Sequence, residues 1–328
     1  MNKKMLAVLP LSALLLVGCA TSTTSSSSFS TQGIQWITPT GAPTLAFFDQ
    51  GANANWVSSS SPATAVVPAL KTDTYDAVVF DGVSGLNVLM AAENPQYKLA
   101  QWISGGNFYL VSTKHASGDT FVTGETIQGF VKTGNAAQSF LKLSKDSWKW
   151  SYDVDTDVVW AAGVADIKTT LLANDTAYDY YLLAEPVLTA TSKALKDKNV
   201  TLNVIYDLQA EWKKAYQQAT IPAAALFVNT NHYATNKGAI DLFLKETQAR
   251  QDKAATNDAS VKTALDAYGD DTATNTRFGF TSALANSLQE TNRFSILASG
   301  VITDKKAFAN DFATTLGGSA YPDNLFLG

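Results

Sequence analysis

Short strand-like apolar runs alternate with helical patterns along most of this 328-residue chain, and this alternation most constrains its fold. Residues 34–38 form a β-type run that breaks at Pro39–Pro43, and a helical stretch follows over residues 44–50. Residues 75–80 repeat the pattern and lead through a glycine-containing turn into an apolar helix over residues 86–93. Such alternation predicts an α/β fold whose ligand loops follow the strands.

A second α/β unit begins near Lys114, and the last third of the chain is mainly helical. The runs 98–103 and 108–113 flank Gly105-Gly106 and are expected to pair as neighbouring strands. Further strands are predicted over residues 126–131, 158–160, 178–183, 201–206 and 223–228, and helices over residues 136–143, 164–173, 186–195, 208–218, 238–253, 259–268, 281–290 and 305–316. This length suits one large domain or two ordinary ones.

The amino terminus has the pattern of a lipoprotein signal peptide. Lys3 and Lys4 precede an apolar stretch, Met5 to Val17, that is too short to span a bilayer comfortably. The stretch ends in Leu16-Val17-Gly18-Cys19, which matches the bacterial lipobox. Residues 1–18 are therefore predicted to be a signal peptide, and Cys19 to carry lipid. The alternative is a plain secretory signal whose cysteine stands there by chance.

Residues 19–31 are almost all Ser and Thr after the cysteine, which predicts a flexible tether. Removal of residues 1–18 leaves 22 Lys and Arg against 29 Asp and Glu, a formal charge of −7. The expected mature form is an acidic globule with no transmembrane helix. Lipid on Cys19 is expected to anchor it at the extracytoplasmic face of the cell membrane.

Composition and the lack of known motifs argue against several classes of function. A net charge of −5 gives no electrostatic footprint for nucleic acid. Neither a metal site nor a cofactor is predicted, since His115 and His232 are far apart in sequence and fall in different predicted units. Asp153-x-Asp155-x-Asp157 lacks the glycine and the later glutamate of a calcium loop and is interpreted as a solvated turn or a strand edge. No catalytic motif appears in its required context, so the chain is not expected to be an enzyme.

Four segments, in order, resemble a known family. They are Thr38-Pro-Thr-Gly-Ala-Pro-Thr-Leu-Ala, Tyr75-Asp-Ala-Val-Val-Phe-Asp-Gly, Tyr178-Asp-Tyr-Tyr-Leu-Leu-Ala-Glu-Pro, and Leu208-Gln-Ala-Glu-Trp-Lys-Lys with the later run from Ile221 to Asn229. Together with the lipobox and the tether, they resemble substrate-binding lipoproteins of ABC-type importers. The resemblance is to the group that carries nitrate, sulfonates and thiamine precursors, and it covers roughly residues 34–316.

The resemblance implies a two-lobed, type II periplasmic-binding-protein fold, in which helices flank a mixed sheet in each lobe. Lobe one is expected to hold residues 32–112 and 223–328, and lobe two residues 113–222, with hinge crossings near Thr113 and Pro222. A cleft between the lobes would take a small molecule and close on it. The implied partner is an ABC permease, and the protein is expected to be a monomer.

Loops that follow strands and open helices are the expected ligand contacts, because their backbone N–H groups are unpaired and the helix dipole favours negative charge there. From lobe one these are Thr40, Gly41, Ala42 and Ser84, with Asp81 as a possible partner for an amine. The alternative interpretation of each is an ordinary turn or cap residue.

Lobe two contributes Thr133 and Asn135 from one such loop, Trp160 at a strand end, and Glu185 before Pro186. Trp160 would close over a planar ligand, with core packing as its alternative, and helix capping is the alternative for Glu185. Asn231 is expected to line the hinge, whereas Trp148 and Trp150 are expected to pack.

The three arginines, Arg250, Arg277 and Arg293, all fall in the C-terminal helical part, which argues against an arginine clamp on a strong anion. A neutral, zwitterionic or aromatic ligand is therefore favoured. The predicted function is capture of that ligand for an ABC-type importer. One alternative is a surface lipoprotein that acts as an adhesin or sensor partner. Another is a pyrimidine-precursor synthase-like enzyme on the same fold, whose cysteine-rich motif this chain lacks.

Overall fold

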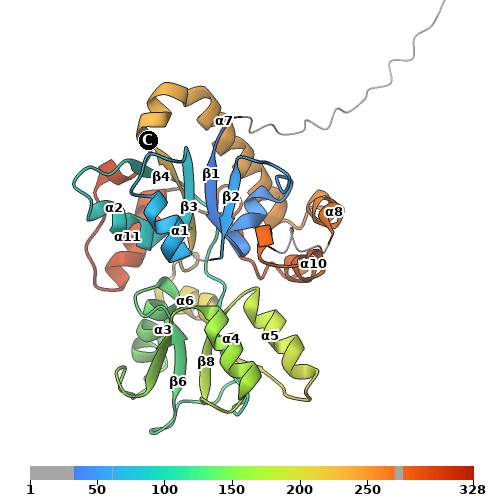
Figure 1. Ribbon diagram of the computed structural model, residues 1–328. Helices are drawn as coiled ribbons and strands as arrows, with labels where there is room; N and C mark the ends of the chain where they lie inside the picture. Colours follow the sequence, from blue (N-terminus) through green and yellow to red (C-terminus); the bar gives the residue numbers. More distant parts are fainter. Residues whose placement is uncertain (1–32, 61, 270–275) are drawn as a thin grey trace, which may run out of the picture. The chain divides into compact units, whose positions relative to one another are not determined.

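The computed structural model describes residues 33–60, 62–269 and 276–328, all of which belong to one compact unit (Figure 1). The predicted signal peptide, Cys19 and the tether lie outside the described residues. What the sequence indicates for them therefore stays a prediction.

The first sheet has five strands in the order β2-β1-β3-β10-β4. Its strands are β1 (Trp36–Pro39), β2 (Trp56–Ser59), β3 (Ala77–Asp81), β4 (Tyr97–Trp102) and β10 (Ala224–Asn229). β1 pairs in parallel with β2 and β3, whereas β10 runs antiparallel to both β3 and β4. The carboxyl ends of β1 to β4 therefore share one edge with the beginning of β10.

The second sheet also has five strands, in the order β7-β6-β8-β5-β9. They are β5 (Phe108–Ser112), β6 (Ile127–Phe130), β7 (Val158–Ala161), β8 (Tyr180–Ala184) and β9 (Asn203–Asp207). β5 is antiparallel to β8 and β9, and β6 is parallel to β7 and β8. The carboxyl ends of β6 to β9 therefore lie beside the beginning of β5.

Helices flank both sheets, which confirms the predicted α/β class with two mixed sheets (Figure 1). With the first sheet are η1 (Ala42–Phe47), α1 (Pro62–Ala69), α2 (Gly82–Met90), α7 (Thr230–Ala255), α8 (Ala259–Tyr268), α10 (Ser282–Glu290), α11 (Lys305–Thr315) and η2 (Asp323–Leu325). With the second are α3 (Asn135–Asp146), α4 (Val164–Ala173), α5 (Val187–Lys196) and α6 (Leu208–Tyr216).

The predicted pairing of residues 98–103 with 108–113 is wrong, because β4 and β5 belong to different sheets. Gly105-Gly106 does not form a hairpin turn but lies in the first crossing between the sheets, residues 103–107. β5 precedes Thr113 and is already part of the second sheet, so the crossing falls earlier than expected. The chain returns to the first sheet through residues 217–223, after α6 and before β10.

An apolar cluster runs through both sheets. It contains Ile37 and Val78 of the first sheet and Leu110 and Tyr180 of the second. Where α6 meets α11, the cluster includes a ring pair between Trp212 and Phe312 whose centroids are 5.0 Å apart. Burial of such side chains is the dominant favourable term in folding. The two sheets therefore share core as well as chain crossings.

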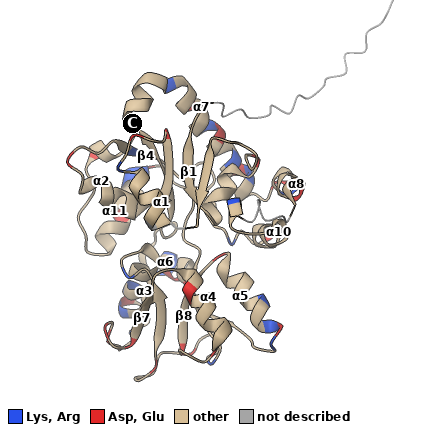
Figure 2. Ribbon diagram, viewed as in Figure 1, with Lys and Arg blue, Asp and Glu red and all other residues tan. Residues whose placement is uncertain are grey.

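Charged residues lie mainly on the helices and loops around the sheets. Blue and red positions are interspersed on the helices of both sheets in Figure 2, as solvated helix faces are. Within residues 33–60, 62–269 and 276–328, no helix combines the length and the apolar character that a membrane span needs.

Candidate functional site

Asp81 and Asn135 connect the loops of the two sheets. Asp81 ends β3 and caps α2, where its Oδ1 accepts a hydrogen bond of 2.7 Å from the backbone N–H of Ser84. Its Oδ2 accepts a bond of 2.7 Å from Nδ2 of Asn135, the buried first residue of α3. The same amide nitrogen donates to the carbonyl of Pro222 at 2.8 Å. Asn135 therefore joins Asp81 to the returning crossing.

The environment of Asp81 favours the protonated acid. Loss of solvent around its carboxyl group raises the pKa from 3.8 to about 6, although the hydrogen bonds from Ser84 oppose the shift. A carboxyl group of this kind changes charge within the physiological pH range. Asp81 can therefore act as an acceptor when ionised and as a donor when protonated.

Glu185 and Arg293 form a second connection. Glu185 is buried after β8, and its carboxylate accepts bonds from the backbone N–H of Thr189 at 3.1 Å and from its hydroxyl at 2.9 Å. Arg293 Nη2 lies 2.6 Å from Glu185 Oε1. Its guanidinium also lies 4.9 Å from the ring centroid of Tyr109, a cation–π contact. Burial raises the pKa of Glu185, and the charge of Arg293 opposes that shift.

Arg293 is the residue that the sequence analysis missed. Its position beyond α10 indicated a C-terminal helical part away from the ligand loops, but the structure places it against Glu185 of the second sheet. No local pattern marks it. The only available signal was that the chain has just three arginines, Arg250, Arg277 and Arg293. Arg250 pairs instead with Asp49, at 2.6 Å.

Several backbone groups that were expected to be free for a ligand are already paired. The N–H of Thr40 donates to Ser59, that of Gly41 donates to Phe278 at 2.7 Å, and that of Ser84 donates to Asp81. Gly41 has a φ of 102°, which a glycine accommodates, and Ala42 is buried at the start of η1. The expectation of unpaired N–H groups is therefore wrong at Thr40, Gly41 and Ser84.

The other residues predicted for the second sheet also lie at its carboxyl edge. Thr133 is exposed in the turn between β6 and α3. Trp160 in β7 lies beside Gly129 of β6, so close that a Cβ added to Gly129 would be 2.5 Å from the indole ring. The Trp160 Nε1 is buried and has no acceptor among the described residues. The ring therefore packs on Gly129 and against the apolar cluster that runs through both sheets, which is the core-packing alternative for Trp160.

Asn231 does not join this set. β10 runs antiparallel to β3, so its carboxyl end lies beside the beginning of β3, as the bond from Asn229 N–H to the Asp76 carbonyl shows. Asn231 follows in α7 and is exposed. Its neighbour His232 pairs with Asp76 at 2.9 Å. The prediction that Asn231 lines the hinge is therefore wrong, because the direction of β10 carries it to the opposite edge.

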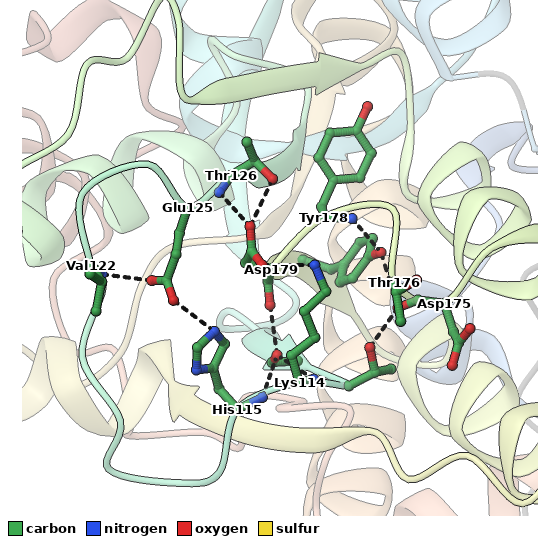
Figure 3. A network of polar contacts seen from close by, with 12 residues as sticks. Lys114, His115, Val122, Glu125, Thr126, Asp175, Thr176, Tyr178 and Asp179 are labelled. Carbon is green, nitrogen blue, oxygen red and sulfur yellow. Dashed lines mark hydrogen bonds and ion pairs between the residues drawn. The ribbon is translucent and has the colours of Figure 1, made fainter.

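A polar network lies at the edge of the second sheet where β6 and β8 begin and β5 ends (Figure 3). The carboxylate of Asp179 receives Lys114 Nζ at 2.8 Å and both the N–H and the hydroxyl of Thr126. Burial would raise the pKa of Asp179, but the bonds from Lys114 and Thr126 outweigh it and lower the pKa. His115 Nε2 lies 2.9 Å from Glu125, whose other oxygen accepts the N–H of Val122. These contacts hold the loop between β5 and β6.

Trp148, Trp150 and the Asp153–Asp157 segment have the structural roles that were expected of them. Trp148 and Trp150 pack together in an aromatic cluster, with ring centroids 5.3 Å apart. The Asp153–Asp157 segment is a turn closed by its own carboxylates. Within the described residues, no group of three or more His, Cys, Asp or Glu side chains could hold a metal ion.

Comparisons with known proteins show what the fold resembles. No family model and no curated protein sequence matches the chain. Among solved structures, the ligand-binding component of an ABC-type import system from Staphylococcus aureus, with zinc bound, matches with a TM-score of 0.64 and 11% identity over 90% of this chain and 96% of that one. The periplasmic aliphatic sulphonate binding protein of Escherichia coli matches with a TM-score of 0.59 and 10% identity, over 88% of this chain and 94% of that one.

A Candida albicans gene product that exhibits the generic periplasmic binding protein structural fold matches with a TM-score of 0.57 and 9% identity, over 87% of this chain and 89% of that one. Identities this low show the fold alone. The chain has the periplasmic-binding-protein fold, and the resemblance seen in the sequence is confirmed at that level. Its structural neighbours include binding components of ABC importers.

Proposed function

We propose that this chain is the solute-binding protein of an ABC-type importer and takes a small molecule between the facing loop sets of its two sheets. The observation that carries the proposal is the pair of connections Asn135–Asp81 and Arg293–Glu185. Asp81 and Asn135 follow strands of different sheets, and Arg293, from the segment after α10, meets Glu185 at the carboxyl end of β8. Ligands bind at such strand ends in α/β folds. The fold and its neighbours support the same function.

The proposed ligand is neutral, zwitterionic or aromatic. Arg293 is the cation of this set, and Glu185 balances its charge at 2.6 Å. Asp81 would repel a strong anion when ionised, whereas it can pair with an amine or accept from a hydroxyl or amide. Thr133 and Asn135 add neutral polar groups, and the Trp160 ring adds an aromatic wall at the same edge.

The proposal includes an ABC permease as partner and a monomeric protein at the extracytoplasmic face of the cell membrane. Lipid on Cys19 would hold it there through the Ser- and Thr-rich tether. A flexible tether would leave the ligand loops free to bind solute and would let the loaded protein reach the permease.

The test is thermal unfolding of residues 31–328 against pyrimidine vitamin precursors, riboflavin, sulfonates, nitrate and amino acids. A ligand at a hundred times its Kd adds about 2.7 kcal/mol of stability, which appears as a raised midpoint. Asn135→Ala should abolish the rise. Asn231→Ala, at the opposite edge of the first sheet, is the matched control and should preserve it.

A saturable rise that Asn135→Ala leaves unchanged would place the ligand elsewhere and contradict the proposed site. If neither the panel nor pooled extract of the native host raises the midpoint, the importer function is contradicted. The surface-lipoprotein alternative would then be favoured.

A further inference from the structure

A pocket of about 380 Å³ lies beside β4, the edge strand of the first sheet. Gln101 and Trp102 of β4 line one side, Gln248 of α7 lies at another, and the segment from Leu297 to Lys305 closes the rest. The volume falls within the range of about 300–1,000 Å³ that small-molecule pockets occupy. None of the residues predicted for the ligand site lines this pocket.

Lys305 is the basic residue that lines the pocket. Its side chain is half-buried at the start of α11, and within the described part of the chain it makes no ion pair or side-chain hydrogen bond. Loss of solvent lowers the pKa of Lys305, and the nearby charge of Asp304 opposes the shift. The adjacent Lys306, by contrast, pairs with Asp323.

The carboxylates near the pocket are engaged with other groups. Asp304 caps α11 and accepts the N–H groups of Lys306 and Ala307, each at 2.9 Å. Asp252 accepts the N–H of Ser299 at 2.6 Å and Nε2 of Gln248 at 3.0 Å. These bonds hold both carboxylates on backbone or amide groups. Asp304 lines the pocket and acts on Lys305 through its charge, but neither carboxylate forms an ion pair with the Lys305 ammonium among the described residues.

The walls of the pocket are held in place. Trp102 Nε1 donates to the carbonyl of Lys305 at 3.0 Å, and its ring meets Phe308 edge-on at 5.0 Å. Gln101 Nε2 donates to Gln248 Oε1 at 3.1 Å, which couples β4 to α7. A preorganised wall spares a ligand part of the entropy cost of binding.

We propose that this pocket is a second binding site and takes a small oxyanion through Lys305. The ligand class follows from the charge, because a half-buried ammonium with no ion-pair partner among the described residues is stabilised by an anionic oxygen that forms a charge-assisted hydrogen bond. The site is separate from the loop set proposed for the imported solute and does not depend on that proposal.

The test combines lysine footprinting with thermal unfolding of residues 31–328. Sodium acetate, sulfate and phosphate are titrated at constant ionic strength against sodium chloride, and acetylation of Lys305 and Lys306 is followed by tandem mass spectrometry. At least one oxyanion should protect Lys305 saturably, leave Lys306 unprotected and raise the unfolding midpoint.

The matched variants are Lys305→Gln and Lys306→Gln, each checked by circular dichroism. Lys305→Gln should raise the Kd obtained from the midpoint titration by about tenfold or more, since charge-assisted hydrogen bonds are of that strength. Lys306→Gln should leave the Kd unchanged. Absence of saturable protection for all three anions overturns the proposal. A midpoint rise that survives in Lys305→Gln also overturns it, because the anion then binds elsewhere, and neither result bears on the solute site.

Discussion

Asp81 is a residue whose position predicts a measurable pH dependence. Its pKa is raised from 3.8 to about 6, so the folded state holds the proton more tightly than the unfolded chain. The stability that this contributes is fully present below about pH 4 and is lost as the pH rises through 6. A shift of this size corresponds to about 3 kcal/mol.

Asp81→Asn should therefore be more stable than the natural chain at pH 8, by about 2 kcal/mol, because removal of the charge outweighs about 1 kcal/mol for the lost bond from Asn135. At pH 4 the gain should vanish. Urea unfolding at both pH values is the measurement. Asp207→Asn, which keeps the cap of α6, is the control and should not reproduce the change. Equal stability differences for Asp81→Asn at pH 4 and pH 8 would contradict the interpretation.

Substitutions of Arg293 and of Glu185 should lower the free energy of unfolding by unequal amounts. The Glu185 side chain is 0% exposed and that of Arg293 is 31% exposed, so loss of the arginine leaves a buried carboxylate without its cation. Arg293→Gln should cost about 2–3 kcal/mol, less than for a fully buried pair because Arg293 reaches solvent. Glu185→Gln should cost less, and the double variant should resemble Glu185→Gln. Urea unfolding of all four proteins forms the cycle, and additive costs would show that the pair is not coupled.

Among the connecting elements, the first crossing depends on close backbone approach. Gly105 forms a bridge with Pro222 of the returning crossing, and a Cβ on Gly105 would lie 2.6 Å from the side chain of Thr220. Gly105→Ala should cost about 1–3 kcal/mol through overpacking, and Thr220→Ala should restore much of the loss. Gly238→Ala in α7, where added atoms meet nothing within 4 Å, should be neutral or stabilising. Chemical unfolding provides the comparison, and a neutral Gly105→Ala would contradict this tight packing.

The crossings also show why some elements were predictable and others were not. Strand and helix periodicity marked most elements, including α4 and α8, because their buried faces repeat in the local sequence. The pairing of β4 with β10 was not predictable, since paired residues such as Trp102 and Ala225 are far apart in the sequence and leave no local signal of their partner or direction. The same limit misplaced Asn231 and hid Arg293. Residues 51–74, which form β2 and α1, were not predicted, and Pro68 inside α1 weakens its helical pattern.

For the whole molecule, the proposed attachment to the membrane rests on Cys19. After removal of residues 1–18 the chain carries a formal charge of −7. An acidic protein is repelled by anionic lipid headgroups, so its own surface charge would not hold it at a membrane. Lipid on Cys19 would then supply the attachment, and two or more acyl chains are needed to make it stable.

Cys19→Ser should therefore release the protein from the membrane fraction into the soluble extracytoplasmic fraction and abolish incorporation of a clickable palmitate analogue. Ser25→Ala, in the tether, changes neither the lipobox nor the cysteine and should stay labelled and membrane-bound. Cell fractionation with in-gel fluorescence measures both properties. If Cys19→Ser stays in the membrane fraction, attachment has another cause. If the natural chain takes up no label and is soluble, the signal is the plain secretory kind, and solute capture would proceed without an anchor.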